Sequence, residues 1–222
     1  MDFVLNAMRD PARQCVNLTK FYREVPLSSP HEHLCRLLAD RSFRLGDFTL
    51  SSGQRSDYYI DCRTTTMHAQ GQVLIGEVGL DAIRATNLKP DAIGGLTMGA
   101  DPVAYAIAGE SWRAGNPLHA FSVRKETKQY GEGRLIEGCF EPGASVIVVE
   151  DVITTGGSAL KACEAVDHAR GKVLGVLSLV DREEGGRAAL EKTGLETIVL
   201  YTASDLRACV QTTSDTVGED TP

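Results

Sequence analysis

The residues best suited to chemistry stand together at positions 150–158, where two carboxylates precede a turn rich in hydroxyl groups and glycine. They follow four strand-forming residues, 146–149, and read Glu150, Asp151, Val152, Ile153, Thr154, Thr155, Gly156, Gly157 and Ser158. A helix is expected directly afterwards, so backbone N–H groups at its N-terminus would face an anion such as phosphate. The carboxylates could accept hydrogen bonds from sugar hydroxyls or hold a magnesium ion. The segment therefore predicts a site for a phosphoribosyl group.

A less specific interpretation is a tight strand-to-helix turn beside a solvated acidic pair. A Gly-Gly turn alone would fit it, but the complete order of strand, two acids, two apolar residues, Thr-Thr-Gly-Gly-Ser and helix is much rarer. The chain has no G-x-G-x-x-G fingerprint, and the Gly94 and Gly99 pair lacks the Lys-Ser/Thr that a P-loop needs. We therefore favour phosphate binding by a turn of neither type.

A second chemical segment, residues 124–134, holds four cations and two glycines within eleven residues. Such a loop can close over a diphosphate, exclude water and strengthen each ionic contact. A charged run is more often a solvated loop tip. Because a phosphate-binding turn is expected in the same protein, which is otherwise acidic, we favour a mobile lid.

The apolar pattern predicts the scaffold that positions these segments. Strands are expected at 92–96, 118–123, 145–150, 173–180 and 195–200, and helices at 67–86, 101–109, 158–169 and 186–192. Asp101 and Pro102 suit the N-cap and N1 positions of their helix. Alternation of this kind predicts an α/β fold with a parallel sheet covered on both faces. Before it come a short helix at residues 34–38 and a hairpin at 48–53 and 57–61. We expect one domain over residues 1–210, with 1–30 as an N-terminal extension and 211–222 as a disordered tail.

Bulk properties exclude several classes of protein. The net charge of −7 argues against a nucleic-acid partner, and no apolar run approaches the length of a membrane span. The six cysteines form no C-x-x-C pair and no metal-ligand spacing, so reduced thiols in a cytoplasmic protein are expected.

Several motifs resemble type I phosphoribosyltransferases, and within them the orotate phosphoribosyltransferases. The acidic pair and its hydroxyl-glycine turn resemble the site for 5-phosphoribosyl-1-diphosphate (PRPP). Four further segments resemble the orotate enzymes in the same order, residues 48–53 with 58–61, 124–131, 136–138 and 181–186. The resemblance covers about Leu34 to Leu206. It implies the type I fold, a central, mainly parallel sheet flanked by helices, with a small N-terminal hood or hairpin and a mobile lid loop.

The resemblance also implies a reaction, in which orotate and PRPP give orotidine 5′-monophosphate and diphosphate with Mg²⁺ as cofactor. Asp151 would contact the metal, directly or through water, and a homodimer would share its lid loops between subunits. Arg124, Lys128 and Asp151 would be the catalytic residues. Orotate would meet Tyr59, Ile60, Thr154 and Arg182. The implied PRPP contacts are Arg124, Lys125, Lys128, Tyr130, Glu150, Asp151, Val152, Ile153, Thr154, Thr155, Gly156, Gly157 and Ser158.

Three positions depart from many family members. Ser51 and Gly99 stand where many members carry lysine, and Tyr130 replaces a lid histidine. Backbone N–H groups of the glycine-rich segment 94–99 could form an anion-binding nest in place of the missing lysine. Two alternatives stay open, a phosphoribosyltransferase for another nucleobase and a non-catalytic sensor of PRPP.

Overall fold

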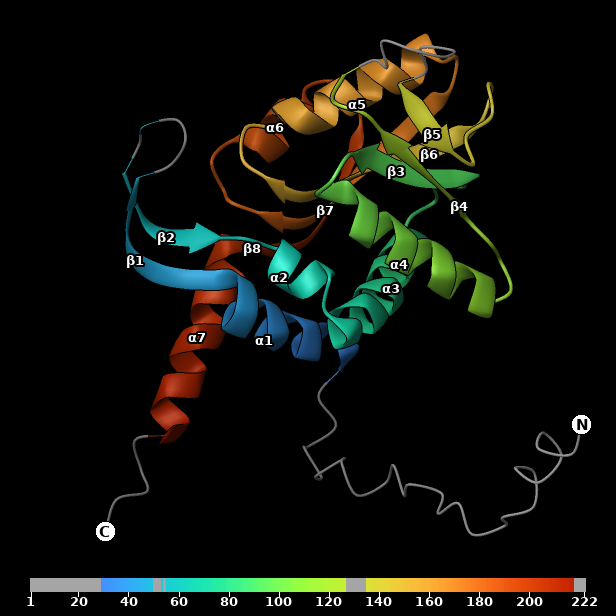
Figure 1. The fold of residues 1–222 in the computed structure, drawn as a ribbon. Helices are drawn as coiled ribbons and strands as arrows, with labels where there is room; N and C mark the ends of the chain where they lie inside the picture. The colour runs from blue at the N-terminus through green and yellow to red at the C-terminus, as the bar shows by residue number, and fades with distance from the viewer. Residues whose placement is uncertain (1–28, 50–52, 54, 127–134, 218–222) are drawn as a thin grey trace, which may run out of the picture.

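The main sheet of the protein is mostly parallel. A computed structural model describes residues 29–49, 53, 55–126 and 135–217, with the backbone alone for 212–217. Among these residues six strands form one sheet in the order β5-β4-β3-β6-β7-β8. They are β3 (Ala92–Leu96), β4 (His119–Val123), β5 (Ile136–Gly138), β6 (Ser145–Ile153), β7 (Lys172–Asp181) and β8 (Glu196–Thr202). Only β4 and β5 pair antiparallel, so the expected sheet is confirmed (Figure 1).

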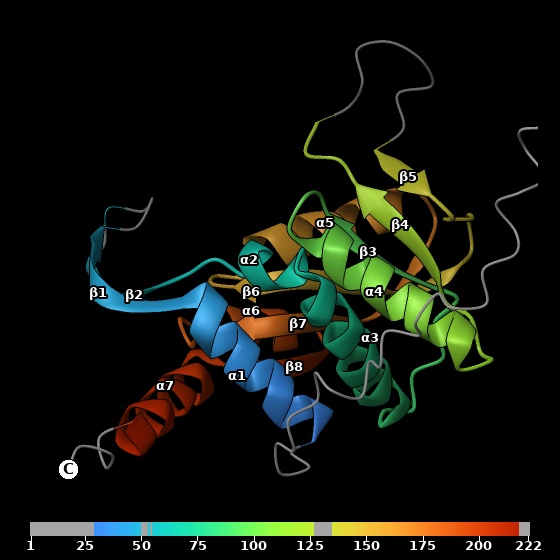
Figure 2. The same ribbon diagram turned by 60° about the horizontal axis from the view of Figure 1, so that its bottom comes forward.

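Helices cover both faces of this sheet (Figure 2). Ile147 and Val149 of β6 pack into the core formed with α3 and α4, whereas Val146 and Val148 pack into the core formed with α5. Successive side chains of a strand point to opposite faces, so a run of four buried apolar residues needs cover on both. The helices are α1 (Pro30–Ser42), α2 (Arg63–Thr66), α3 (Ala69–Arg84), α4 (Ala100–Arg113), α5 (Gly157–His168), α6 (Gly186–Glu191) and α7 (Ala203–Val217).

A separate antiparallel hairpin stands beside the main sheet, as expected from the sequence. It consists of β1 (Phe43–Thr49) and β2 (Arg55–Ile60), with Phe43 paired to Ile60 at its base. Strand β1 begins five residues before its expected start, directly after α1. The hairpin base is therefore fixed to the helical layer, and β2 leads straight into α2 at the edge of the site described below.

Two expected boundaries are wrong for reasons that the tertiary structure supplies. Asp101 does not cap α4, because Gly99 is the N-cap and the Asp101 carboxylate instead accepts hydrogen bonds from Thr97 Oγ1 and Ser122 Oγ, both at 2.6 Å. Strand β6 does not end at Glu150. It continues to Ile153 because β7 pairs with it as far as Asp181. The acidic pair therefore lies inside a strand.

From the sequence, no helix was expected after the last strand. Helix α7 packs against α1, and its backbone is helical through Val217, beyond the residue at which the tail was expected to begin. Once packing has formed the first turns, each further residue adds a hydrogen bond at little extra cost. Residues 1–28 and 218–222 lie outside the described part of the chain.

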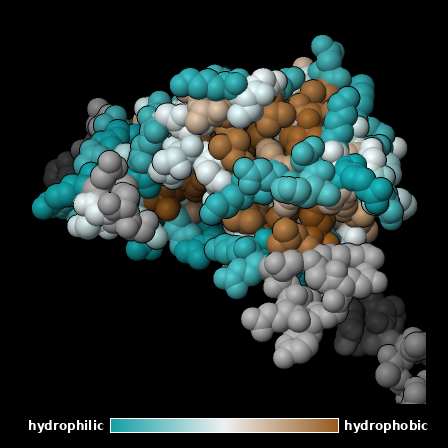
Figure 3. Space-filling model, turned by 90° about the horizontal axis from the view of Figure 1, so that it is seen from above, coloured by the Kyte–Doolittle hydropathy of each residue, from teal (hydrophilic) through white to brown (hydrophobic). Residues whose placement is uncertain are grey.

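The surface carries hydrophobic residues as well as charge. The upper side of the molecule in Figure 1 shows hydrophobic residues gathered near its middle, with hydrophilic residues around them (Figure 3). Elsewhere, Tyr105 and Trp112 of α4 are 52% and 74% exposed. A transmembrane helix needs roughly 20 apolar residues, and no helix among the described residues is long and apolar enough to be one.

Candidate active site

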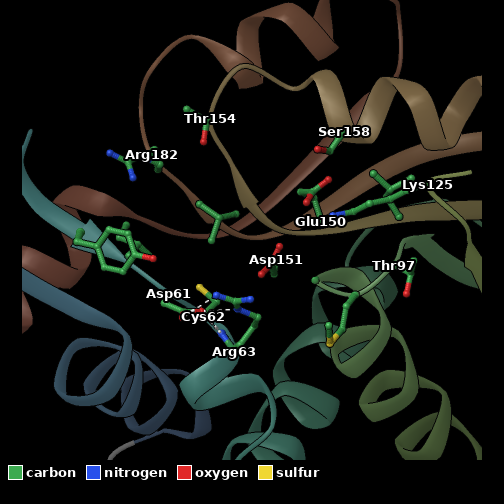
Figure 4. A pocket seen from close by; sticks show the side chains of 16 residues that line it. Asp61, Cys62, Arg63, Thr97, Lys125, Glu150, Asp151, Thr154, Ser158 and Arg182 are labelled. Carbon is green, nitrogen blue, oxygen red and sulfur yellow. Dashed lines mark hydrogen bonds and ion pairs between the residues drawn. The ribbon is translucent and has the colours of Figure 1, made fainter. Parts of the chain in front are cut away.

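A cavity of about 350 Å³ opens where β3 and β6 end (Figure 4). Strands β3 and β6 are neighbours in the sheet. The strand that follows β3 in the chain, β4, lies on one side of this pair, and the strand that follows β6, β7, lies on the other, so the strand order reverses between β3 and β6. Ligands of open α/β sheets bind at such a point. The lining residues are Tyr59, Ile60, Asp61, Cys62, Arg63, Leu96, Thr97, Met98, Gly99, Lys125, Glu150, Asp151, Val152, Thr154, Ser158 and Arg182.

The hydroxyl-glycine turn forms the rim of this cavity and a smaller one of about 70 Å³, which Ile153, Thr155, Gly156 and Gly157 also line. Gly156 has φ +83° and is the N-cap of α5, a left-handed conformation that favours glycine. Gly186 packs so closely against this turn that a Cβ at its position would overlap the Thr154 carbonyl oxygen. The loop therefore presents the start of a 12-residue helix to the cavity, as anion binding requires.

The acidic pair does not carry two full charges. Burial, followed by the neighbouring Asp151, raises the pKa of Glu150 from 4.5 to about 8. Burial also raises the pKa of Asp151, whereas hydrogen bonds from the backbone of Val152 and from the Glu150 side chain lower that pKa. Two close carboxylates that are shielded from water resist double ionisation, so Glu150 keeps its proton up to its raised pKa. Glu150 Oε2 is buried without a hydrogen-bond partner among the described residues.

The departure at position 99 has a structural reason. A Cβ at Gly99 would overlap the Asp151 carboxylate, so a side chain here is incompatible with the observed position of Asp151. The expected glycine nest over 94–99 is wrong in part. Gly94 and Gly95 lie inside β3, where a Cβ would overlap the backbone oxygens of β4 and β6. Of this segment, Leu96 at the end of β3 and the turn Thr97–Gly99 reach the cavity.

Arg182 reaches the same cavity from the turn after β7 (Figure 4). Its side chain is only 7% exposed, and its Nε donates to Glu184 Oε1 at 2.8 Å. Its Nη2 is buried with no partner among the described residues. Leaving a charged donor unsatisfied is costly, and a bound anion would remove that cost. Tyr59 and Ile60, at the end of the hairpin, line the cavity with it.

The lid segment is only partly described. Lys125 lines the cavity, whereas Arg124 does not, and its Nε donates to Glu137 Oε1 at 3.1 Å. Lys128 and Tyr130 lie outside the described residues, as does Ser51.

Sequence reasoning missed three consecutive residues that line the cavity, Asp61, Cys62 and Arg63. Arg63 begins α2 and forms a double hydrogen bond with Asp61, from Nε to Oδ1 at 2.8 Å and from Nη2 to Oδ2 at 2.9 Å. An Asp-x-Arg sequence directly after the expected hairpin was the available signal. The missed arginine adds a cation close to the acidic pair (Figure 4).

Comparison with known proteins agrees with this geometry. No model of a protein family matches the chain. The orotate phosphoribosyltransferase of Aquifex aeolicus (strain VF5) is 48% identical over 178 residues, 79% of this chain and 96% of that relative. That of Thermosynechococcus vestitus is 45% identical over 190 residues, 84% of this chain and 98% of the relative.

Solved structures show the same likeness. The orotate phosphoribosyltransferase of Mycobacterium tuberculosis H37Rv, in complex with Fe(III) dicitrate, has a TM-score of 0.72 at 42% identity, covering 80% of this chain and 99% of its own. The same enzyme in complex with PRPP has a TM-score of 0.66 at 35% identity, covering 81% and 93%. The fold is that of the type I phosphoribosyltransferases. Because this chain matches almost the full length of these relatives at 48% and 45% identity, it belongs to the orotate phosphoribosyltransferase family.

Proposed function

We propose that this protein transfers the 5-phosphoribosyl group of PRPP to orotate, giving orotidine 5′-monophosphate and diphosphate in the synthesis of UMP. The observation that carries the proposal is one cavity shared by a helix start, the acidic pair Glu150–Asp151 and a buried arginine whose Nη2 has no hydrogen-bond partner among the described residues. Each matches one part of the reactants: the 5′-phosphate, the ribose and the carboxylate of orotate. Family membership supports the same reaction.

The turn of residues 154–158 would hold the 5′-phosphate through backbone N–H groups and hydroxyls. Val152 and Ile153 bring β6 to this turn, and Glu150 and Asp151 would face the ribose hydroxyls from the strand. Negative charge on the pair would favour the positive charge that develops on the sugar as diphosphate leaves.

Departure of diphosphate leaves an oxocarbenium-like ribose, so the barrier falls mainly through stabilisation of the leaving group. Lys125 lies in the cavity for this purpose, and Arg124, Lys128 and Tyr130 would join it from the lid. The Asp151 carboxylate, which lines the cavity, suits Mg²⁺, since hard cations prefer carboxylate and phosphate oxygens. Bound through Asp151, directly or through water, magnesium would add positive charge beside the diphosphate.

Arg182 would bind the orotate carboxylate through its unpartnered Nη2, with Thr154 beside it and Tyr59 and Ile60 bordering the ring. A guanidinium suits a carboxylate because its donors match the two oxygens. Replacing Arg182 by lysine should therefore raise the KM for orotate and leave the KM for PRPP unchanged. Unchanged orotate kinetics would remove Arg182 from the site.

We also propose a homodimer in which each lid serves the neighbouring site. Tyr105 and Trp112 lie seven residues apart on α4, hence on one side of it, and both are exposed. Exposed apolar residues of this size suit a protein interface. Mixing subunits that carry Lys128→Ala with subunits that carry Asp151→Asn tests the sharing. Random mixing makes half of the dimers heterodimers, and in each heterodimer one of the two sites has both an intact Asp151 and an intact Lys128. About a quarter of wild-type activity should therefore return. With a lid that serves its own subunit, none returns.

The proposed reaction is tested by following orotate consumption with PRPP and magnesium, beside adenine, hypoxanthine and uracil as alternative bases. Turnover with orotate and with none of the other three bases supports the proposal, and removal of magnesium by a chelator should abolish that turnover. Preference for another base would indicate a different phosphoribosyltransferase. Binding of PRPP without any turnover would indicate a sensor. The proposal includes a cytoplasmic location, which the cysteine spacing in the sequence suggests.

A further inference from the structure

Tyr58, in β2 of the hairpin, makes two contacts with Arg182, a residue 124 positions away in the chain. Its hydroxyl donates a hydrogen bond to the Arg182 carbonyl oxygen at 3.1 Å. The Arg182 guanidinium carbon lies 4.8 Å from the centroid of the Tyr58 ring, within the range of a cation–π interaction. One side chain thus contacts both the backbone and the charged group of the same arginine.

The Tyr58 ring is itself held by its surroundings. It stacks on Phe43 of β1, with centroids 5.3 Å apart and an angle of 19° between the planes. Arg207 of α7 lies 5.5 Å from the same ring centroid and forms an ion pair with Asp57 of β2 at 2.9 Å. Tyr58 therefore has a fixed position, set jointly by the hairpin and α7, from which it can orient another group.

The turn that carries Arg182 is anchored on its other side as well. Glu184 accepts from Arg182 Nε, and Glu183, which has φ +62°, accepts from Ser204 N and Oγ at 2.9 and 2.6 Å. With Nε committed to Glu184 and the guanidinium next to the Tyr58 ring, Nη2 remains for a ligand. The direction of this donor depends on contacts that Tyr58 supplies.

We infer that Tyr58 is a positioning residue for orotate: it fixes the guanidinium of Arg182 in the orientation that receives the carboxylate. The inference rests on the proposed role of Arg182. Tyr58 itself is not among the residues that line the cavity, so its effect on substrate has to pass through another side chain. Burial raises the pKa of the Tyr58 phenol, so the hydroxyl keeps its proton and remains a donor.

Tyr58→Phe is the deciding variant, because it removes the hydroxyl and keeps the ring on Phe43 and Arg182. The loss of one hydrogen bond should raise the KM for orotate about 3- to 10-fold, with kcat and the KM for PRPP within about twofold of wild type. The matched control is Tyr201→Phe. Tyr201 also donates from its hydroxyl to a distant carbonyl, that of His31 at 2.8 Å, but it is not among the residues lining the cavity. Tyr201→Phe should leave the KM for orotate and the KM for PRPP unchanged.

The double variant with Arg182→Lys separates this inference from the function on which it rests. If Tyr58 acts through Arg182, adding Tyr58→Phe to Arg182→Lys should cause little further rise in the KM for orotate. Additive effects would overturn the inference. So would an orotate KM that responds to Arg182→Lys but not to Tyr58→Phe, or equal changes in all kinetic constants for Tyr58→Phe. An orotate KM insensitive to Arg182→Lys would instead refute the proposed role of Arg182.

Discussion

Replacing Glu150 by glutamine should make the folded protein more stable than wild type at alkaline pH. Burial and the neighbouring Asp151 raise the pKa of Glu150 from 4.5 to about 8. Between these two values the folded protein keeps a proton that the unfolded chain has released. The free energy of unfolding therefore falls as pH rises through this window.

The size of the effect follows from the shift. One pKa unit corresponds to about 1.4 kcal/mol, so a shift from 4.5 to about 8 costs at most about 5 kcal/mol of stability above pH 8. Structural relaxation around the charge reduces this, and we expect about 2 to 5 kcal/mol. Glutamine has no proton to lose, so Glu150→Gln should lack this loss. The raised pKa of Asp151 affects both proteins and largely cancels in their difference.

Urea unfolding at a series of pH values from about 5 to about 9, at one protein concentration, measures this difference. The advantage of Glu150→Gln over wild type should grow steadily with pH. Glu141→Gln, the same chemical change at an exposed position, should show a constant difference. A Glu150→Gln advantage that is equal at both ends of the range would refute the assignment of a proton to Glu150.

Three further substitutions test the geometry of the site. Gly156→Ala should lower the free energy of unfolding by about 1 to 2 kcal/mol, because Gly156 has φ +83°, and should raise the KM for PRPP; thermal unfolding and kinetics check both. Gly99→Ala should displace the Asp151 carboxylate and lower kcat/KM for PRPP about tenfold, whereas unchanged kinetics would show that Asp151 tolerates the move. Arg63→Ala should raise the KM for PRPP more than that for orotate, because Arg63 adds positive charge beside the acidic pair; equal effects on both would contradict a contribution of Arg63 to PRPP binding.

The sequence alone determined the features that depend on neighbouring residues. The run Val146–Val149 predicted a strand buried on both faces, and the Thr-Thr-Gly-Gly-Ser order predicted a turn leading into a helix, since both follow from local periodicity and backbone preference. The proposed phosphate-binding half of the site could be predicted for the same reason, because residues 150–158 are contiguous.

Only the tertiary structure decided which distant residues meet. Tyr58 reaches Arg182 across 124 positions, and Gly99 lacks a side chain because Asp151, from another strand, occupies the space. The proton on Glu150 likewise depends on burial by the assembled core. Contacts of this kind are set by how layers pack, and local propensity carries no information about them. The strand-to-helix turn could thus be predicted from the chain, whereas the contacts of Tyr58 with Arg182 are apparent only in the folded structure.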